Sequence, residues 1–127
     1  MVEAPTAAAL NRAKQVIQSA IEKKQLTPVL SIVEHGFPVN EPLVYIGANL
    51  LMLVADKCTE TELNQILPLN PDINATDKIG RTALHYACRA GNLSTFKVLA
   101  ELDDTDVDAV TNSGVTPLML AVESADI

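Results

Sequence analysis

The chain has 127 residues, a formal net charge of −7 and an isoelectric point near 4.6. This length suits one domain with a shared core. The acidic balance argues against nucleic acid and against an anionic membrane surface as partners, because both bind basic faces. Apolar residues make up 48% of the chain but aromatic residues only 3%, so we expect small and aliphatic side chains to fill a core of closely packed helices.

Export and membrane insertion are not expected. Two cysteines, Cys58 and Cys88, are too few for a disulfide scaffold, and the N-terminal sequence lacks the charged and apolar regions of a signal peptide. The longest apolar run, residues 50–55, is far shorter than the roughly 18 residues that a membrane span needs. We therefore expect a soluble protein of a reducing compartment, cytoplasmic, nuclear or both.

The first predicted elements are two helices, near residues 8–22 and 27–35. Together they form an N-terminal cap unit over residues 8–43. No turn motif precedes the first helix, and its outer face is expected to be polar, as the end of a repeat array requires. The residues of that predicted outer face are Arg12, Lys14, Gln15, Gln18, Glu22 and Lys23.

After the cap, the chain repeats itself with a period of 33 or 34 residues. The corresponding segments are GANLLMLVA at 47–55, GRTALHYAC at 80–88 and GVTPLMLAV at 114–122. A second landmark keeps a spacing of 34, in the pairs VN at 39–40, IN at 73–74 and VD at 107–108. Self-similarity at this period indicates stacked repeats. The predicted units span residues 44–76, 77–110 and, incomplete, 111–127.

The repeated motif has a physical reading as a turn followed by a helix. Gly80 and Gly114 occupy positions where a tight turn needs a positive φ, which glycine adopts without steric cost. Thr82 and Thr116 can cap the following helix by accepting from a free backbone amide. Pro117 suits the first helical turn, where its missing N–H would have no partner in any case.

The segment DKIGRTALHYACRAG at 77–91 closely resembles the ankyrin repeat, as do VEHGFPVN at 33–40 and DINA at 72–75. The resemblance extends over the chain from about residue 13. It implies an all-α repeat solenoid, an ankyrin array of helix-turn-helix units with short hairpin-like turns, forming a single domain over residues 1–127. The tetratricopeptide repeat has a similar helical period, but its own landmarks are missing here.

The unit at 44–76 departs most from the ankyrin pattern, with Asn49 and Leu50 where the family has Thr and Pro. Residues 50–55 are apolar on every side of the helix, which indicates burial between neighbours. The sequence PLNP at 68–71 is expected to end the second helix of this unit.

The helix predicted from Pro117 is also apolar, and no partner helix follows it in the sequence. The end of an array is normally polar on its outer face. We therefore expect either that the chain is part of a longer protein or that a partner or a second copy covers this helix.

His85 and Cys88 are three residues apart on one predicted helix, and with His35 and Cys58 they would complete a two-Cys, two-His zinc set. The structural interpretation is favoured instead. The ankyrin resemblance implies that His85 bonds neighbouring turns, and Cys88 occupies a small position where a free thiol packs well. No metal and no cofactor are expected.

Asp104, Asp106 and Asp108 alternate as the first ligands of a calcium loop do, but Ala109 and Val115 stand where that loop needs Gly and Glu. A solvated acidic loop is therefore favoured.

The sequence NLS at 92–94 fits a glycosylation acceptor, although the start of a helix is the favoured interpretation. The two histidines have structural explanations, and no phosphate loop or Ser-His-Asp set is present, so we do not expect an enzyme.

The resemblance implies that a partner binds the turn tips and the exposed side of the first helices, which line a concave face. The predicted partner-binding residues are Tyr45, Ile46, Asp56, Lys57, Lys78, Ile79, Arg81, Arg89, Asn112 and Val115. Three basic residues gather on this face, Lys78, Arg81 and Arg89, beside apolar and aromatic side chains. This composition favours a protein partner with an acidic and partly apolar segment, although the charges could equally serve only to solvate the tips.

Two functions follow from this surface. The first is a non-catalytic protein–protein interaction module, an adaptor or scaffold segment that binds a separate protein. The second is a regulatory or targeting domain of a longer chain, which could be an enzyme, a transport protein or a transcription regulator. The oligomeric state is left open, and the fold by itself does not choose between the two functions.

Overall fold

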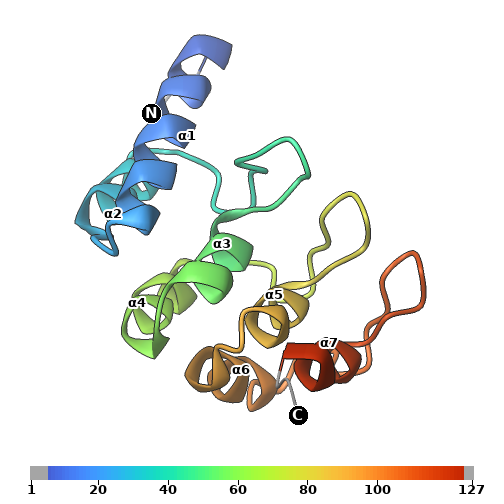
Figure 1. Cartoon of the computed structure of the whole chain (residues 1–127). Helices are drawn as coiled ribbons and strands as arrows, with labels where there is room; N and C mark the ends of the chain where they lie inside the picture. The colour runs from blue at the N-terminus through green and yellow to red at the C-terminus, as the bar shows by residue number, and fades with distance from the viewer. Residues whose placement is uncertain (1–5, 125–127) are drawn as a thin grey trace.

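The computed structural model describes residues 6–124 and shows an all-α repeat array, with no strand in that part of the chain. The elements in order are α1 (Ala7–Glu22), α2 (Thr27–Glu34), α3 (Leu50–Lys57), α4 (Glu60–Ile66), the 3₁₀ helix η1 (Leu67–Leu69), α5 (Ala83–Arg89), α6 (Leu93–Ala100) and α7 (Pro117–Ser124). Figure 1 shows helix pairs stacked side by side, with long loops that project from one side of the stack. The predicted fold class is confirmed.

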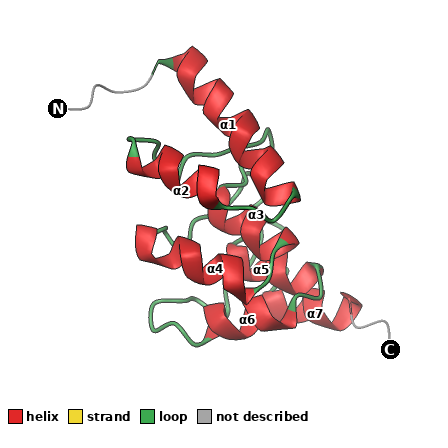
Figure 2. Ribbon diagram, turned by 90° about the vertical axis from the view of Figure 1, so that its left-hand side faces the viewer, coloured by secondary structure: helices red, strands yellow, loops and turns green. Residues whose placement is uncertain are grey.

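The helices form two layers, which Figure 2 shows as two columns. Helices α1, α3, α5 and α7 lie in one layer, and each contacts the next. Helices α2, α4 and α6 form the other layer, and α4 contacts α6. The core lies between the layers, because each pair buries its apolar face against its neighbours.

Helix α3 lies deep in this core. Its residues Leu50, Leu51, Met52, Val54 and Ala55 are all buried, as the apolar pattern on every side of this helix predicts. Contacts with α1 and with α5 bury most of residues 50–55, and the charged residues Asp56 and Lys57 come only at the end of the helix. The side chain of Asn49 caps the helix by accepting from the amide of Met52 at 3.0 Å, so Asn replaces Thr here without loss of the cap.

Three hairpin-like turns, here called tips 1, 2 and 3, span residues 43–48, 77–81 and 111–115. Each is closed by an amide–carbonyl bond, from Leu43 to Ala48 at 2.7 Å, Asp77 to Arg81 at 2.9 Å and Thr111 to Val115 at 2.9 Å. The tip glycines at 47, 80 and 114 have φ values of 92°, 86° and 80°. The positive φ predicted for Gly80 and Gly114 is confirmed.

The tips are joined to one another by backbone hydrogen bonds. The amide of Lys78 in tip 2 donates to the carbonyl of Ile46 in tip 1 at 2.8 Å, and Asn112 in tip 3 donates to Ile79 in tip 2 at 2.9 Å. The side-chain amide of Asn112 also donates to the carbonyl of Lys78 at 3.2 Å. This tip ladder holds the three turns in one row.

His85 connects α5 to both its own cap and the following tip. Its Nδ1 accepts from the amide of Thr82 at 3.1 Å, and the Thr82 side chain accepts from the His85 amide, which forms a capping box. With Nδ1 as acceptor, Nε2 carries the proton and donates to the carbonyl of Val115 at 2.8 Å. The structural role predicted for His85 is confirmed, and Thr116 likewise caps α7 by accepting from Met119.

In the segments that lead into the tips, asparagines connect successive units. Asn40 accepts from the amide of Asp72 at 2.7 Å, and Asn74, 34 residues later, accepts from the amide of Asp106 at 2.9 Å. Asn74 also donates to the carbonyl of Asp104 at 2.7 Å. The acidic side chains at 104, 106 and 108 are exposed, as a solvated loop predicts.

Two residues assigned to the polar outer face of α1 face the segment that enters tip 1 instead. Lys14 pairs with Glu41 at 3.1 Å, and Gln18 donates to the carbonyl of Leu43 at 2.8 Å. That part of the prediction is wrong, because the chain entering tip 1 runs along this side of α1. The remaining four, Arg12, Gln15, Glu22 and Lys23, are exposed.

Two predictions for the second layer are confirmed, the end of α4 near residues 68–71 and the start of α6 at Asn92. Helix α4 stops at Ile66 and tightens into η1 before Asn70, which adopts a left-handed conformation with φ of 58°. Asn92 begins α6 and accepts from the amide of Thr95, while its side-chain amide donates to the carbonyls of Ala55 and Cys58. The nitrogen that a glycan would need is therefore used to join the second and third helix pairs.

The first testable prediction compares two tip glycines. A Cβ at Gly80 would lie 2.8 Å from Oδ1 and 2.9 Å from the backbone nitrogen of Asn112, whereas at Gly114 it meets no described atom within 4 Å. Both positions carry the cost of a positive φ, about 1 kcal/mol. We expect Gly114→Ala to lower the free energy of unfolding by about that amount and Gly80→Ala by about 3 kcal/mol. Urea unfolding measures both, and equal losses would contradict the close contact between tips 2 and 3.

Candidate partner-binding surface

The exposed ends of tips 1 and 2 bring together three of the predicted site residues. Tyr45 has 91% of its surface exposed, and the ammonium of Lys78 lies 4.1 Å from the centre of its ring. Ile79 at the end of tip 2 is also exposed. An aromatic ring and an aliphatic side chain beside a cation have the composition of an interface anchor, and the rigid tip ladder presents them in one row.

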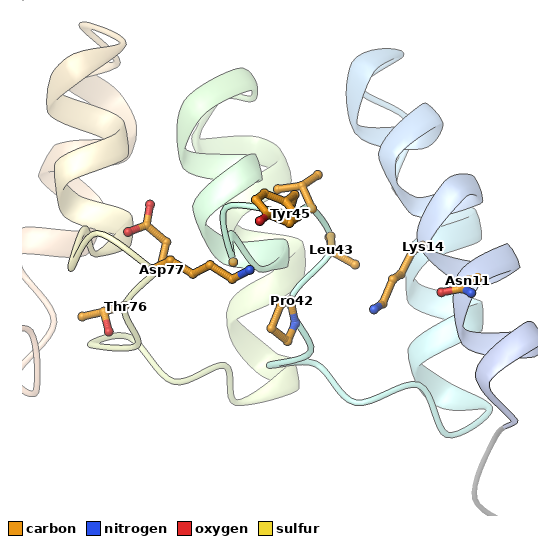
Figure 3. A pocket seen from close by; sticks show the side chains of 10 residues that line it. Asn11, Lys14, Pro42, Leu43, Tyr45, Thr76 and Asp77 are labelled. Atoms are coloured by element: carbon orange, nitrogen blue, oxygen red, sulfur yellow. The ribbon is translucent and has the colours of Figure 1, made fainter.

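A groove of about 510 Å³ runs below tip 1 from α1 to tip 2. Figure 3 shows Asn11 and Lys14 on α1 at one end, Pro42 and Leu43 in the middle, and Thr76 and Asp77 at the other end. The remaining lining residues are Val44, Tyr45, Gly47 and Lys78. We call this feature the tip groove.

The α1 wall of the tip groove was missed in the sequence interpretation. Asn11, Lys14 and Gln18 are three and four residues apart, so they share one helix face. Of the three, Lys14 and Gln18 are among the residues that the sequence assigns to an outer, solvated face. The available signal was Glu41 just before tip 1, a possible ion partner for Lys14, but only the structure places the two side by side.

Arg81 is directed inward and does not present a free charge. Its Nε lies 2.8 Å from Oδ2 of Asp77, its Nη2 is 3.2 Å from the Tyr86 hydroxyl, and its guanidinium lies 4.8 Å from the centre of the Tyr86 ring. The Tyr86 hydroxyl donates to the same Asp77 oxygen at 2.6 Å. The part of the hypothesis that counts Arg81 among the exposed basic residues is therefore corrected.

The network around Asp77 shifts the pKa values of its members. Burial disfavours the Asp77 carboxylate, but hydrogen bonds from Tyr86 and Arg81 and the charge of Arg81 outweigh it, so the Asp77 pKa is lowered from 3.8. The pKa of Tyr86 is raised to about 12, mainly by burial. The hydrogen bond to Asp77 and the negative charge of that carboxylate add to the rise. The Asp77 carboxylate also accepts from the amides of Ile79 and Arg81, so it organises tip 2.

The predicted residues on the first helices form a second group, with Asp56 and Lys57 on α3 and Arg89 on α5. Asp56 lies 3.9 Å from both Lys57 and Arg89, and the Arg89 guanidinium is 5.3 Å from the centre of the Tyr86 ring. All three side chains retain exposed surface. The opposite charges are partly neutralised within this group.

The predicted residues Ile46, Asn112 and Val115 contribute backbone groups that hold the tips together. Ile46 and Val115 are only partly exposed and offer their carbonyls to Lys78 and His85. Asn112 is exposed, but both its backbone and side-chain amides bond to tip 2.

Lys78 differs from the other basic residues of the predicted site. Within residues 6–124, Lys57, Arg81 and Arg89 each have a carboxylate within 4.0 Å, and Lys78 has none. Its ammonium lies over the Tyr45 ring instead. The basic character of the surface is therefore concentrated at the Tyr45–Lys78 pair.

The two cysteines and two histidines each have a structural role, and they do not form one site. Burial raises the pKa of the Cys58 and Cys88 thiols to about 11, so both thiols stay protonated near neutral pH. Both ring nitrogens of His85 are bonded, and His35 bonds the carbonyl of Ser31 at 2.7 Å. In the part of the chain that the structure describes, no group of three potential metal ligands is present.

None of the helices between residues 6 and 124 has the length and apolar character that crossing a membrane requires.

Comparison with known proteins identifies the repeat. A family model for ankyrin repeats in three copies matches residues 51–127, more than half of the chain. The chain belongs to the ankyrin-repeat family. Ankyrin repeats generally mediate protein–protein interaction, which agrees with an exposed row of tips.

The relatives of this ankyrin array include segments of much larger proteins. It is 31% identical over 97 residues, 76% of the chain, to neurogenic locus notch homolog protein 1 of Danio rerio. It is 36% identical over 94 residues to neurogenic locus notch homolog protein 2 of Homo sapiens. It is 30% identical over 83 residues to an ankyrin repeat-containing protein of Schizosaccharomyces pombe. Each of these two matches covers 65% of the chain. The similar segment is only 4% of either Notch protein and 36% of the yeast protein.

The second prediction concerns the acid stability of tip 2. Because the Asp77 pKa is lower in the folded chain than its ordinary value of 3.8, ionised Asp77 stabilises the fold above that pH, and this stabilisation is lost as pH falls through the folded pKa. We expect the difference in unfolding free energy between wild type and Asp77→Asn to be constant above about pH 5 and to narrow below about pH 4.

Tyr86→Phe supplies the control, since it removes the hydroxyl donor but keeps the carboxylate. Its stability should depend less on acid than that of wild type and more than that of Asp77→Asn. Urea unfolding at a series of pH values measures all three proteins. Parallel pH profiles would show that Asp77 does not have a lowered pKa.

Proposed function

We propose that this ankyrin array is a non-catalytic protein–protein interaction module, an adaptor or scaffold segment, that binds its partner on the concave face of tips and first helices. The observation that carries the proposal is the exposed Tyr45–Lys78 pair on a row of tips held rigid by backbone hydrogen bonds. A preorganised aromatic and cationic anchor reduces the ordering cost of binding.

The proposed partner is a protein with an acidic and partly apolar segment. Lys78 supplies a positive charge without a carboxylate neighbour in residues 6–124, and Tyr45 and Ile79 supply exposed aromatic and aliphatic surface. Of the ten predicted residues, these three and Arg89 are proposed as direct contacts. Arg81, Ile46 and Val115 are proposed to act by holding the tips in place.

The second candidate is a regulatory or targeting ankyrin domain within a longer protein. The observation that favours it is the similarity to small segments of the Notch proteins, of which the matched part is 4%. The exposed apolar side chains of Leu118, Met119 and Val122 on α7 are also consistent with further contacts on that side. A cytoplasmic or nuclear location is part of both proposals, since both thiols are free and buried.

The third prediction tests which face binds. Lys78→Glu reverses a charge on tip 2, and Lys97→Glu makes the same change at an exposed position on α6, in the other helix layer. For a protein captured by the wild-type chain and then purified, we expect Lys78→Glu to weaken binding about tenfold or more and Lys97→Glu by less than about twofold. Titration calorimetry measures both.

Equal weakening by the two variants would indicate only an overall charge effect and contradict binding on the concave face. Loss of binding with Lys97→Glu alone would place the partner on the second helix layer.

A further inference from the structure

Tips 2 and 3 each donate one backbone amide to the tip before them, and tip 1 has the equivalent amide without such a bond. Lys78 and Asn112 each stand two residues before their tip glycine, and each donates its amide to the preceding tip. Tyr45 stands two residues before Gly47, and its amide has no acceptor among residues 6–124. The reason lies in the cap unit, where the described residues before tip 1 form α1 and α2 and no further tip.

The tip groove lies on this side of tip 1. Its walls include Asn11 and Lys14 of α1, and the segment leading to Tyr45 forms its middle. Because Lys78 and Asn112 donate toward the preceding unit, the equivalent Tyr45 amide is directed toward the α1 side. A free backbone donor beside a groove is the arrangement that an extended peptide can use by adding its own carbonyl.

We propose that an extended, acidic segment of the partner protein binds in the tip groove as an additional tip. A carbonyl of the segment accepts from the Tyr45 amide, in the way that Ile46 accepts from Lys78. A carboxylate of the segment bonds the Lys78 ammonium, and an apolar side chain lies on the exposed Tyr45 ring. This inference rests on the proposed interaction function and specifies the form of the partner and its place on the surface.

The charges around the groove favour an acidic occupant. Asp77 lines the groove, but its side chain is fully buried and its charge is neutralised by Arg81. Lys78 is exposed and has no carboxylate within 4.0 Å in the described chain. Lys14 shares its charge with Glu41. The chain as a whole carries −7, so this locally positive site selects where an acidic segment can approach.

The test begins with a phage-displayed library of random 12-residue peptides, selected on the full wild-type chain. We expect the selected peptides to be enriched in Asp and Glu beside an aliphatic or aromatic residue. One selected peptide is then synthesised, and its dissociation constant is measured by fluorescence anisotropy. Lys78→Glu should weaken this peptide about tenfold or more, while Lys97→Glu leaves it within about twofold.

The backbone contact is tested with two substitutions at one residue. Tyr45→Ala removes the ring and keeps the amide, whereas Tyr45→Pro removes both. Residue 45 is the first inner position of a turn closed by the Gly47–Val44 bond at 2.9 Å, where proline is commonly accommodated. We expect Tyr45→Pro to bind the peptide about five times more weakly than Tyr45→Ala, the effect of one amide hydrogen bond.

An independent measurement uses the wild-type chain, so it does not depend on the folding of variants. In a ¹⁵N-labelled sample, hydrogen exchange of the Tyr45 amide should slow when the selected peptide is added. Equal binding by Tyr45→Ala and Tyr45→Pro, together with unchanged exchange, would overturn the added-tip geometry.

The other outcomes separate this inference from the proposed function. Selected peptides that are sensitive to Arg89→Glu but not to Lys78→Glu would overturn the groove assignment and leave an interaction module intact. Self-association of the wild-type chain in analytical ultracentrifugation, abolished by Lys78→Glu, would assign the groove to a second copy and also overturn it. A chain that retains neither peptide nor protein would contradict both proposals.

Discussion

No helix pair in this chain can bury its apolar surface alone, and the rest of the structure depends on that constraint. Helix α3 is one example, since its residues 50–55 are apolar on every side and the helix packs between α1 and α5. The stacking that buries it also sets the spacing of the tips, because each tip leads directly into a first-layer helix. The surface proposed to bind a partner is therefore a consequence of how the core is built.

Polar groups make this stacking specific. Apolar contact alone would tolerate small slides between neighbouring pairs, but hydrogen bonds need defined distances. The tip ladder, the bond from His85 to Val115 and the asparagine bonds before the tips each join one unit to the next. They lie at three different positions along the units, so they fix both spacing and rotation. In the proposed function, this ordering of the tips reduces the cost of using Tyr45 and Lys78 as an anchor.

The same network explains why the basic residues of the predicted site have different surroundings. Arg81 is three residues from Lys78 in sequence, yet its guanidinium serves the buried Asp77 carboxylate and Tyr86. Lys78 projects from the tip and contacts an exposed ring instead. A buried carboxylate requires a nearby donor or cation, and Arg81 meets that need. The positive charge available to the proposed acidic partner is consequently smaller and more localised than the number of basic residues indicates.

Most of the fold was predictable from the sequence, because a repeat imposes the same local requirements at a fixed period. The positive φ at Gly80, the cap at Thr82 and the burial of residues 50–55 all follow from nearby residues. The candidate site was predictable only in part. Tyr45, Lys78 and Ile79 were assigned to exposed tips by their place in the repeat, but the tip groove and its α1 wall were not foreseen.

The difference has a physical cause. By itself, the sequence determined the helices, the turns and the order of the units, since these depend on interactions within a few residues or on the repeat. The tertiary structure alone decided which charges are neutralised, because Lys14 meets Glu41 and Arg89 meets Asp56 across 27 and 33 residues of chain. The tertiary structure also decided which tip amides have an acceptor. The amides of Lys78 and Asn112 bond to the preceding tip, whereas the Tyr45 amide has no acceptor in residues 6–124. Only stacking brings each later tip against an earlier one, so the sequence by itself does not show this difference.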